Sequence, residues 1–133
     1  MKNYIKFFGM LLMIAVIQSG AYAENHPTVK PGDDVVVYYF HATKRCVTCK
    51  AVEAVTKEAL KEYYGEKVVL TSINREKDKK NPLLKKYKVN GQTLLVVKGD
   101  EVVNLTSDAF LNARTKPEKL KKKIKTTIDS MLK

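Results

Sequence analysis

The hydrophobic positions along the chain predict strands and helices in alternation. Residues 34–40 (DVVVYYF) form an unbroken β-branched and aromatic run, which is typical of a strand buried on both faces. Residues 67–73 (KVVLTSI) predict a second strand. Residues 92–105 (QTLLVVKGDEVVNL) predict a hairpin of two strands around a Gly-Asp turn. The sequence therefore predicts four strands.

Three helices are predicted between or after these strands. Apolar residues recur at helical intervals from Val52 to Tyr63, and Gly65 is expected to end that helix. Residues 81–87 (NPLLKKY) offer an N-cap asparagine and a proline at the first helical position. Residues 115–118 (TKPE) fit a capping box that opens the last helix. The apolar stripe of this helix is expected to face the core and consists of Leu120, Ile124, Ile128, Met131 and Leu132.

The order of these elements predicts the topology. Two strands joined by a helix form a βαβ unit, so the first two strands are expected to be parallel with a right-handed crossover, and the hairpin adds antiparallel strands. We expect an α/β domain at residues 34–133, with a four-stranded mixed sheet flanked by helices on both faces. In its last helix, Lys121, Lys122 and Lys123 fall between the apolar positions and are expected to face water.

The first 23 residues have the pattern of a secretory signal peptide. Lys2 and Lys6 precede an apolar run at residues 7–17, and Ala21 and Ala23 supply the small residues of a cleavage site. The apolar run is about 11 residues long, whereas a transmembrane helix needs about 20. An uncleaved membrane anchor is the less favoured alternative.

Cleavage at this site would define the mature protein. The mature chain would begin at Glu24 on the far side of the inner membrane, so a periplasmic location is expected. Residues 24–33 are polar and contain two prolines, which indicates an arm outside the core. The remaining length fits one small domain with one core.

The charge of the chain narrows its partners but not its fold. The net charge is +11, from 25 basic and 14 acidic residues. Such a charge favours solubility and attraction to anionic partners. Arginines are few and no aromatic–basic platform is visible, so no nucleic-acid binding is expected. We expect a monomer without a cofactor.

Both cysteines lie in one short segment, residues 41–54 (HATKRCVTCKAVEA), as a CxxC motif. The motif opens the first helix after a buried strand, and in this context the chain resembles the thioredoxin superfamily. The run CVTCK is also similar to the motif in the C-terminal thioredoxin-like domain of the bacterial periplasmic thiol-disulfide interchange reductase. The resemblance implies exchange with protein thiols or disulfides, in a reductive or electron-relay role. Because no reductant pool exists outside the cytoplasm, the electrons are expected to come from a membrane-borne donor.

The chain departs from the family pattern at three places. Arg45 precedes the first cysteine, where thioredoxins carry tryptophan. Gln92 precedes Thr93 where the family has a cis-proline, so these two residues are expected to border the substrate groove. The family's buried acid on the first strand is replaced by an aromatic residue, either Tyr39 or Phe40.

The position of the two cysteines predicts different roles for them. Cys46 lies at the N-terminus of a helix, where the dipole and free N–H groups lower a thiol pKa, so it is the expected nucleophile. Cys49 lies one turn further along and is expected to be buried and to resolve the mixed disulfide. The groups expected to stabilise the Cys46 thiolate are Lys44, Arg45, Thr48 and Lys50.

Three other uses of the cysteines remain open from the sequence. A structural disulfide is disfavoured, because closing so short a loop removes only about 2 kcal/mol of chain entropy. His41, Cys46 and Cys49 would together offer three ligands to copper or zinc. A thioredoxin-like scaffold that binds a protein without catalysis is the third alternative.

Overall fold

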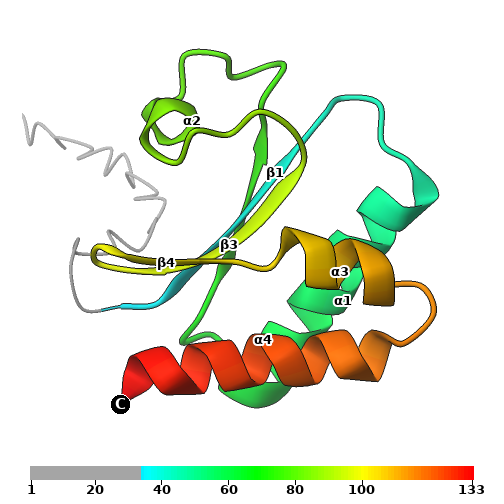
Figure 1. The fold of residues 1–133 in the computed structure, drawn as a ribbon, viewed down its shortest axis with the longest axis vertical. Helices are drawn as coiled ribbons and strands as arrows, with labels where there is room; N and C mark the ends of the chain where they lie inside the picture. The colour runs from blue at the N-terminus through cyan, green and yellow to red at the C-terminus, as the bar shows by residue number, and fades with distance from the viewer. Residues whose placement is uncertain (1–33) are drawn as a thin grey trace, which may run out of the picture.

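Four strands form one sheet in the order β2-β1-β3-β4 (Figure 1). The computed structural model describes residues 34–133. In it β1 (Val36–His41) pairs in parallel with β2 (Leu70–Asn74) and antiparallel with β3 (Thr93–Lys98). The strand β4 (Glu101–Asn104) completes the hairpin with β3. The predicted mixed four-stranded sheet and α/β class are confirmed.

Helices cover both faces of this sheet, as predicted. The helices α1 (Val47–Tyr64), α3 (Thr106–Asn112) and α4 (Pro117–Leu132) share one hydrophobic core with one face. The short helix α2 (Pro82–Lys86) packs against the opposite face (Figure 1). The larger core therefore lies beneath the helix that begins at the CxxC motif.

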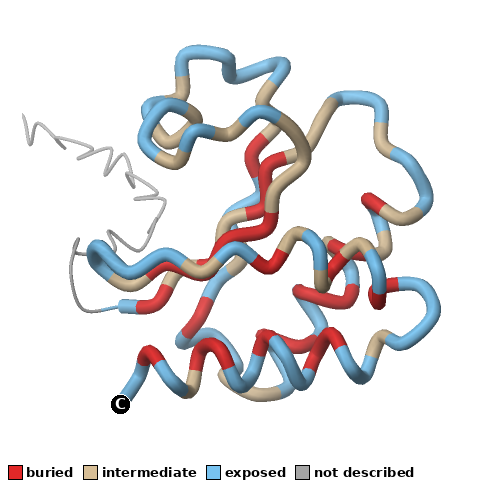
Figure 2. Tube along the Cα trace, viewed as in Figure 1, coloured by how far each residue is buried: buried red, intermediate tan, exposed pale blue. Residues whose placement is uncertain are grey.

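The central strand β1 contributes to both cores. Val37 and Tyr39 are fully buried on the side of α1. Phe40 is fully buried on the other side, together with Leu95 and Ile73. Figure 2 shows the buried positions concentrated along the middle of the sheet and on the inner sides of α1 and α4. The sequence run that predicted a strand buried on both faces is thus confirmed.

Two predicted helix ends are present in the structure. The helix α1 ends at Gly65, whose φ of 61° favours glycine and whose N–H donates to the Lys61 carbonyl at 3.1 Å. At the start of α2, the Asn81 side chain accepts a hydrogen bond from the Leu83 N–H at 3.0 Å.

The predicted capping box at residues 115–118 is wrong. The N-cap of α4 is Lys116, and no side chain caps it. Thr115 lies one residue too early, and its hydroxyl donates instead to the Leu111 carbonyl at 3.2 Å. That contact belongs to the end of α3, a helix that the sequence pattern did not predict.

The apolar stripe of α4 is confirmed except at its last position. Leu120, Ile124 and Ile128 are fully buried, and Met131 is nearly so. Leu132 is half exposed, because Met131 takes the final core-facing position of the helix.

Lys121 was expected to face water, and that prediction is wrong. Its side chain is buried, and its Nζ lies 2.8 Å from Glu58 and 3.1 Å from Glu62, both on α1. Glu118 approaches it at 3.3 Å from within α4. Hydrogen bonds to Glu58 and Glu62 raise the pKa of Lys121 above its ordinary value. The ammonium group therefore joins α4 to α1. Lys122 and Lys123 are exposed as predicted.

The predictions for the signal peptide and for the arm fall at residues 1–33, outside the described residues. Among the helices of residues 34–133, none combines the length and hydropathy required to cross a bilayer.

The packing of α4 can be tested at Ile124. Because this side chain is fully buried against the sheet and α1, Ile124→Ala should lower the free energy of unfolding by about 2–5 kcal/mol. Urea unfolding followed by circular dichroism measures the change. Lys122→Ala, at an exposed position of the same helix, is the control and should change stability by less than about 0.5 kcal/mol. Equal effects at both positions would show that α4 does not pack as described.

Candidate active site

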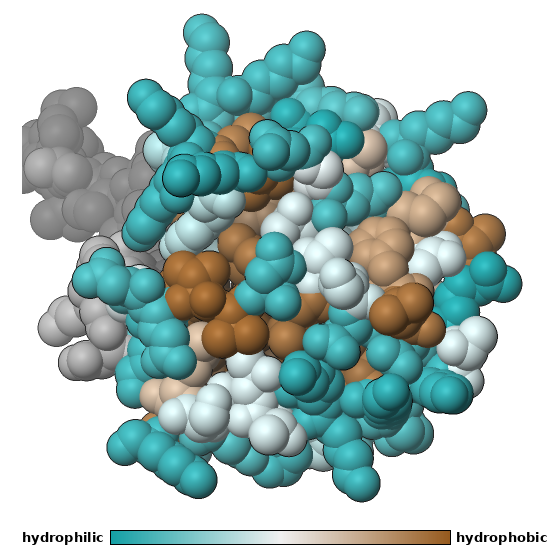
Figure 3. All heavy atoms as spheres, viewed as in Figure 1, coloured by the Kyte–Doolittle hydropathy of each residue, from teal (hydrophilic) through white to brown (hydrophobic). Residues whose placement is uncertain are grey.

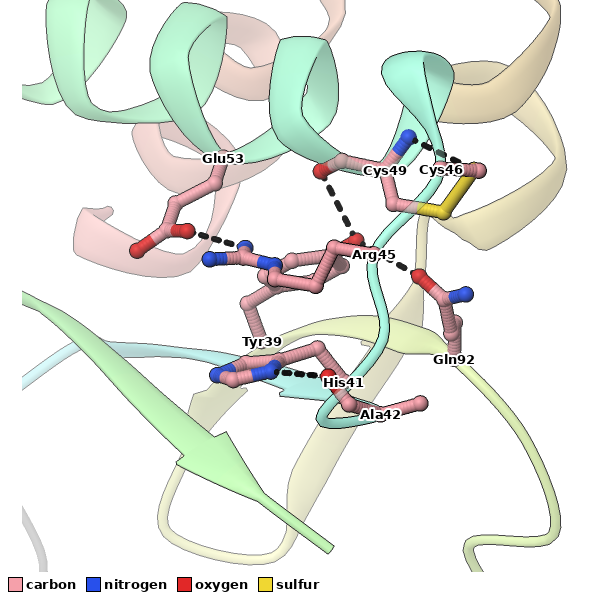
Figure 4. The surroundings of a disulfide bond; sticks show 8 residues. All are labelled: Tyr39, His41, Ala42, Arg45, Cys46, Cys49, Glu53 and Gln92. Atoms are coloured by element: carbon pink, nitrogen blue, oxygen red, sulfur yellow. Dashed lines mark hydrogen bonds and ion pairs between the residues drawn. A yellow bond between two sulfur atoms is a disulfide. The ribbon is translucent and has the colours of Figure 1, made fainter.

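Cys46 and Cys49 form a disulfide at the start of α1 (Figure 4). Their Cα atoms are 5.1 Å apart and the sulfurs 2.00 Å apart. Cys46 is exposed, whereas Cys49 is fully buried. A partner can therefore reach the first cysteine and not the second.

Cys46 is also the N-cap residue of α1. Its backbone is extended, and its sulfur accepts a hydrogen bond from the Cys49 N–H at 3.1 Å. An N–H group aimed at the sulfur and the positive end of the helix dipole both favour a thiolate over a thiol. The site thus has the geometry that lowers the pKa of a reduced Cys46.

The residues predicted to stabilise the Cys46 thiolate differ in their exposure. Lys44 and Lys50 are exposed on either side of the motif. Thr48 is half-buried, and its hydroxyl forms no hydrogen bond within residues 34–133. The lysines supply a general positive potential rather than a direct contact.

Arg45 is directed away from the sulfurs and toward Glu53 (Figure 4). Its guanidinium forms an ion pair with the Glu53 carboxylate and lies 5.7 Å from the centre of the Tyr39 ring. Lys57 holds the other oxygen of Glu53 at 2.8 Å. Although partial burial raises the pKa of Glu53, hydrogen bonds from Lys57 and Arg45 outweigh it and lower that pKa to about 2. The charge of Arg45 is therefore largely neutralised in place.

Tyr39 lies beneath the disulfide. Of the two aromatic candidates, Tyr39 and Phe40, it is therefore the one at the position of the family's buried acid. Its hydroxyl lies 3.0 Å from the Cys49 carbonyl oxygen and 3.0 Å from Oε1 of Gln92. Burial raises the pKa of Tyr39, so the hydroxyl stays protonated at neutral pH and can donate. Phe40 points to the opposite face of the sheet.

The Tyr39 hydroxyl carries one proton and cannot donate to two acceptors at once. A turn of the Gln92 amide by 180° brings its NH₂ group to the hydroxyl, and all contacts are then satisfied. In that arrangement Gln92 donates to Tyr39, and Tyr39 donates to Cys49. The chain of hydrogen bonds joins the loop before β3 to the first turn of α1.

Gln92 and Thr93, the two residues predicted to border the substrate groove, lie at the start of β3. The Gln92 amide contacts the Tyr39 hydroxyl, which in turn contacts the Cys49 carbonyl (Figure 4). Thr93 begins β3 opposite Phe40, and its hydroxyl donates to the Gly91 carbonyl at 3.2 Å. The peptide bonds of the described chain are all trans, so the family's cis-proline has no conformational counterpart here.

The three-ligand metal site considered from the sequence is not assembled. His41 Nδ1 lies 2.9 Å from the Ala42 carbonyl, and the imidazole lies 5.9 Å from the Tyr39 ring, centre to centre. Across residues 34–133 no group of three His, Cys, Asp or Glu side chains is arranged to hold a metal ion. His41 therefore contributes to packing at the end of β1.

A family profile described as thioredoxin matches residues 16–126, which is most of the chain. The protein belongs to the thioredoxin family. No curated protein sequence matched the chain. As a thioredoxin-family domain whose CxxC pair lies at disulfide distance, it has the parts needed for thiol–disulfide exchange.

Three solved structures resemble this chain at low identity. Trxlp from Edwardsiella tarda is 18% identical, with a TM-score of 0.52 over 69% of this chain and 82% of its own. The germline-specific thioredoxin Deadhead from Drosophila melanogaster is 22% identical, with a TM-score of 0.49 over 74% of this chain and 81% of its own. A malarial protein is 25% identical, with a TM-score of 0.43 over 53% of this chain and 75% of its own. The first of these similarities supports the fold alone.

The sequence did not predict two sets of contacts at the site, the ion pair of Arg45 with Glu53 and the hydrogen bonds of Tyr39. Glu53 follows Arg45 by eight residues, and the pairing depends on how the loop before α1 turns back over the helix. The bonds from Tyr39 to Cys49 and Gln92 join residues 10 and 53 positions apart. A tyrosine in a strand expected to be buried on both faces was a usable signal, because a buried hydroxyl needs a hydrogen-bond partner.

The role of the Tyr39 hydroxyl can be tested by Tyr39→Phe. Loss of a buried hydrogen-bonded hydroxyl should lower the free energy of unfolding of the oxidised protein by about 1–2 kcal/mol. Tyr38→Phe is the matched control, since Tyr38 neighbours it on the other face and its hydroxyl forms no hydrogen bond within the described chain. Denaturant unfolding measures both, and a larger loss from Tyr38→Phe would contradict the network.

Proposed function

We propose that this protein is an exported thiol–disulfide oxidoreductase that works in the reducing direction or relays electrons. The observation that carries the proposal is the contrast between an exposed Cys46 sulfur at a helix N-terminus and a fully buried Cys49. The first can attack a partner, and the second can act only within the molecule. A structural staple would not require this contrast.

The reaction begins with both cysteines reduced. The Cys46 thiolate attacks one sulfur of a substrate disulfide, forms a mixed disulfide and releases the other substrate sulfur as a thiolate. The Cys49 thiol then loses its proton, and its thiolate attacks the Cys46 sulfur. The second substrate sulfur leaves, the Cys46–Cys49 disulfide forms, and two electrons have passed to the substrate. The proton of Cys49 and the proton that Cys46 released to solvent on ionising end on the two substrate thiols.

The return to the dithiol requires a donor of two electrons. Outside the cytoplasm no large pool of reduced thiols is available, so a membrane-borne donor is the proposed source. The similarity of CVTCK to the interchange reductase motif supports this direction. The protein is proposed to act as a monomer on protein thiols and disulfides.

The division of labour between the cysteines is testable by substitution. Cys46→Ser should abolish exchange with a disulfide-bonded protein substrate, because the accessible nucleophile is gone. Cys49→Ser should accumulate a mixed disulfide through Cys46, because nothing resolves it. Non-reducing electrophoresis and mass spectrometry detect the adduct.

The double variant Cys46→Ser/Cys49→Ser is the control and should form no adduct. If Cys46→Ser traps the substrate and Cys49→Ser does not, the two roles are reversed. If neither single variant affects exchange or trapping, the proposed oxidoreductase activity is refuted.

Export is tested on the protein recovered from the periplasm of a bacterial host. Because Ala21 and Ala23 fit the cleavage rule, the intact mass should correspond to a chain that begins at Glu24. Ala23→Arg should block cleavage and leave the longer, membrane-associated precursor. Export with Met1 retained in the wild type would show that the segment is an anchor.

A further inference from the structure

Positive charge is concentrated in one segment beside the sheet. Residues 75–88, which run from the end of β2 through α2, contain two acidic and seven basic residues. The lysines of this segment are all exposed. We call residues 75–88 the basic lobe, and its basic residues are Arg75, Lys77, Lys79, Lys80, Lys85, Lys86 and Lys88.

The positive charges of the basic lobe are balanced only in part, by its own two acids, and Arg75 and Lys79 both act electrostatically on Glu76. Among residues 34–133, every ion pair lies on the opposite side of the sheet, in the loop before α1 or on α1, α3 and α4. The helix α1 itself holds three lysines and three glutamates. The two acids of the lobe form structural hydrogen bonds: Glu76 accepts from the Thr43 N–H at 2.9 Å, and Asp78 accepts from the Asn81 amide at 2.7 Å. The lobe therefore presents a local excess of positive charge to solvent.

Hydrogen bonds attach the lobe to the loop that carries the reactive cysteine. The Arg75 N–H donates to the His41 carbonyl at 3.0 Å, and the Thr43 N–H is bound by Glu76. His41 and Thr43 lie in the segment that leads to Cys46, and the parallel strands β1 and β2 end side by side, so the start of the lobe and Cys46 lie at the same end of the sheet (Figure 1). Figure 3 shows long hydrophilic side chains projecting from the α2 end of the molecule.

We propose that the basic lobe, together with Lys44 and Lys50, recognises a redox partner whose disulfide is surrounded by acidic side chains. The inference rests on the proposed function and names the chemistry of its substrate. A protein surface that reaches Cys46 also meets the start of the lobe, because hydrogen bonds join Arg75 and Glu76 to the loop that precedes Cys46. Charge complementarity of this kind raises association rates about 10- to 1,000-fold and is screened by salt.

The first experiment compares two synthetic peptides of equal length, each with one disulfide. One carries glutamates around its cysteines, and the other carries lysines at the same places. The reduced full-length mature protein should exchange with the acidic peptide about tenfold faster than with the basic one at low ionic strength. The difference should nearly vanish at about 0.5 M salt, where charges are screened within a few ångströms.

Charge-reversal variants locate the effect on the surface. Lys79→Glu/Lys80→Glu should slow exchange with the acidic peptide about tenfold at low salt. Lys119→Glu/Lys122→Glu changes the net charge equally at exposed positions of α4 and is the matched control. Its rate should stay within about twofold of the wild type. Circular dichroism confirms that both variants are folded.

The outcomes separate this inference from the proposed function. Exchange with neither peptide refutes the oxidoreductase itself. Exchange with both peptides at equal, salt-independent rates, or an equal loss in both variants, overturns the role of the lobe and leaves the oxidoreductase in place. Binding to phosphatidylglycerol vesicles that Lys79→Glu/Lys80→Glu abolishes, without preference for the acidic peptide, also overturns it and assigns the lobe to a membrane surface.

Discussion

The side-chain alternation of β1 determines what lies beneath the reactive cysteines. This strand pairs with neighbours on both edges and is covered on both faces, so its register is fixed. Tyr39 consequently faces α1 and Phe40 faces α2. A slip of one residue would place a phenyl ring under Cys49 and remove the hydroxyl that its carbonyl binds. The chemistry of the site therefore depends on sheet pairing as much as on the CxxC motif.

One atom links the folding of α1 to its reactivity. Helices usually begin with a serine, threonine, aspartate or asparagine whose oxygen accepts a free N–H. Here the Cys46 sulfur takes that role in the folded, oxidised protein. The same N–H remains available to a thiolate after reduction, so the cap needs no rearrangement to stabilise the nucleophile. The far half of α1 is held by Glu58 and Glu62, which bind the buried Lys121 of α4.

The apolar pattern predicted the strands, α1 and α4, and the asparagine and proline at the start of α2 predicted that helix. It missed α3, whose seven residues are too few for a clear period and whose start has no side-chain cap. It placed Lys121 in water because its carboxylate partners come from α1, about 60 residues earlier. It identified both cysteines and the border residue Gln92, but not the ion pair that directs Arg45 away from the sulfurs. What was missed depends on contacts between distant segments, which a local pattern does not contain.

The replacement of an acid by Tyr39 changes how Cys49 can lose its proton. In the described structure the Tyr39 hydroxyl binds the Cys49 carbonyl and the Gln92 amide, and neither a tyrosine hydroxyl nor an amide accepts a proton at neutral pH. Glu53 is ionised but is held by Arg45 and Lys57. In the proposed reaction, however, the first step itself releases a substrate thiolate next to the pair, and a thiolate is a base of the required strength. The proton of Cys49 can pass to this departing sulfur, so resolution is coupled to the substrate rather than to a resident carboxylate.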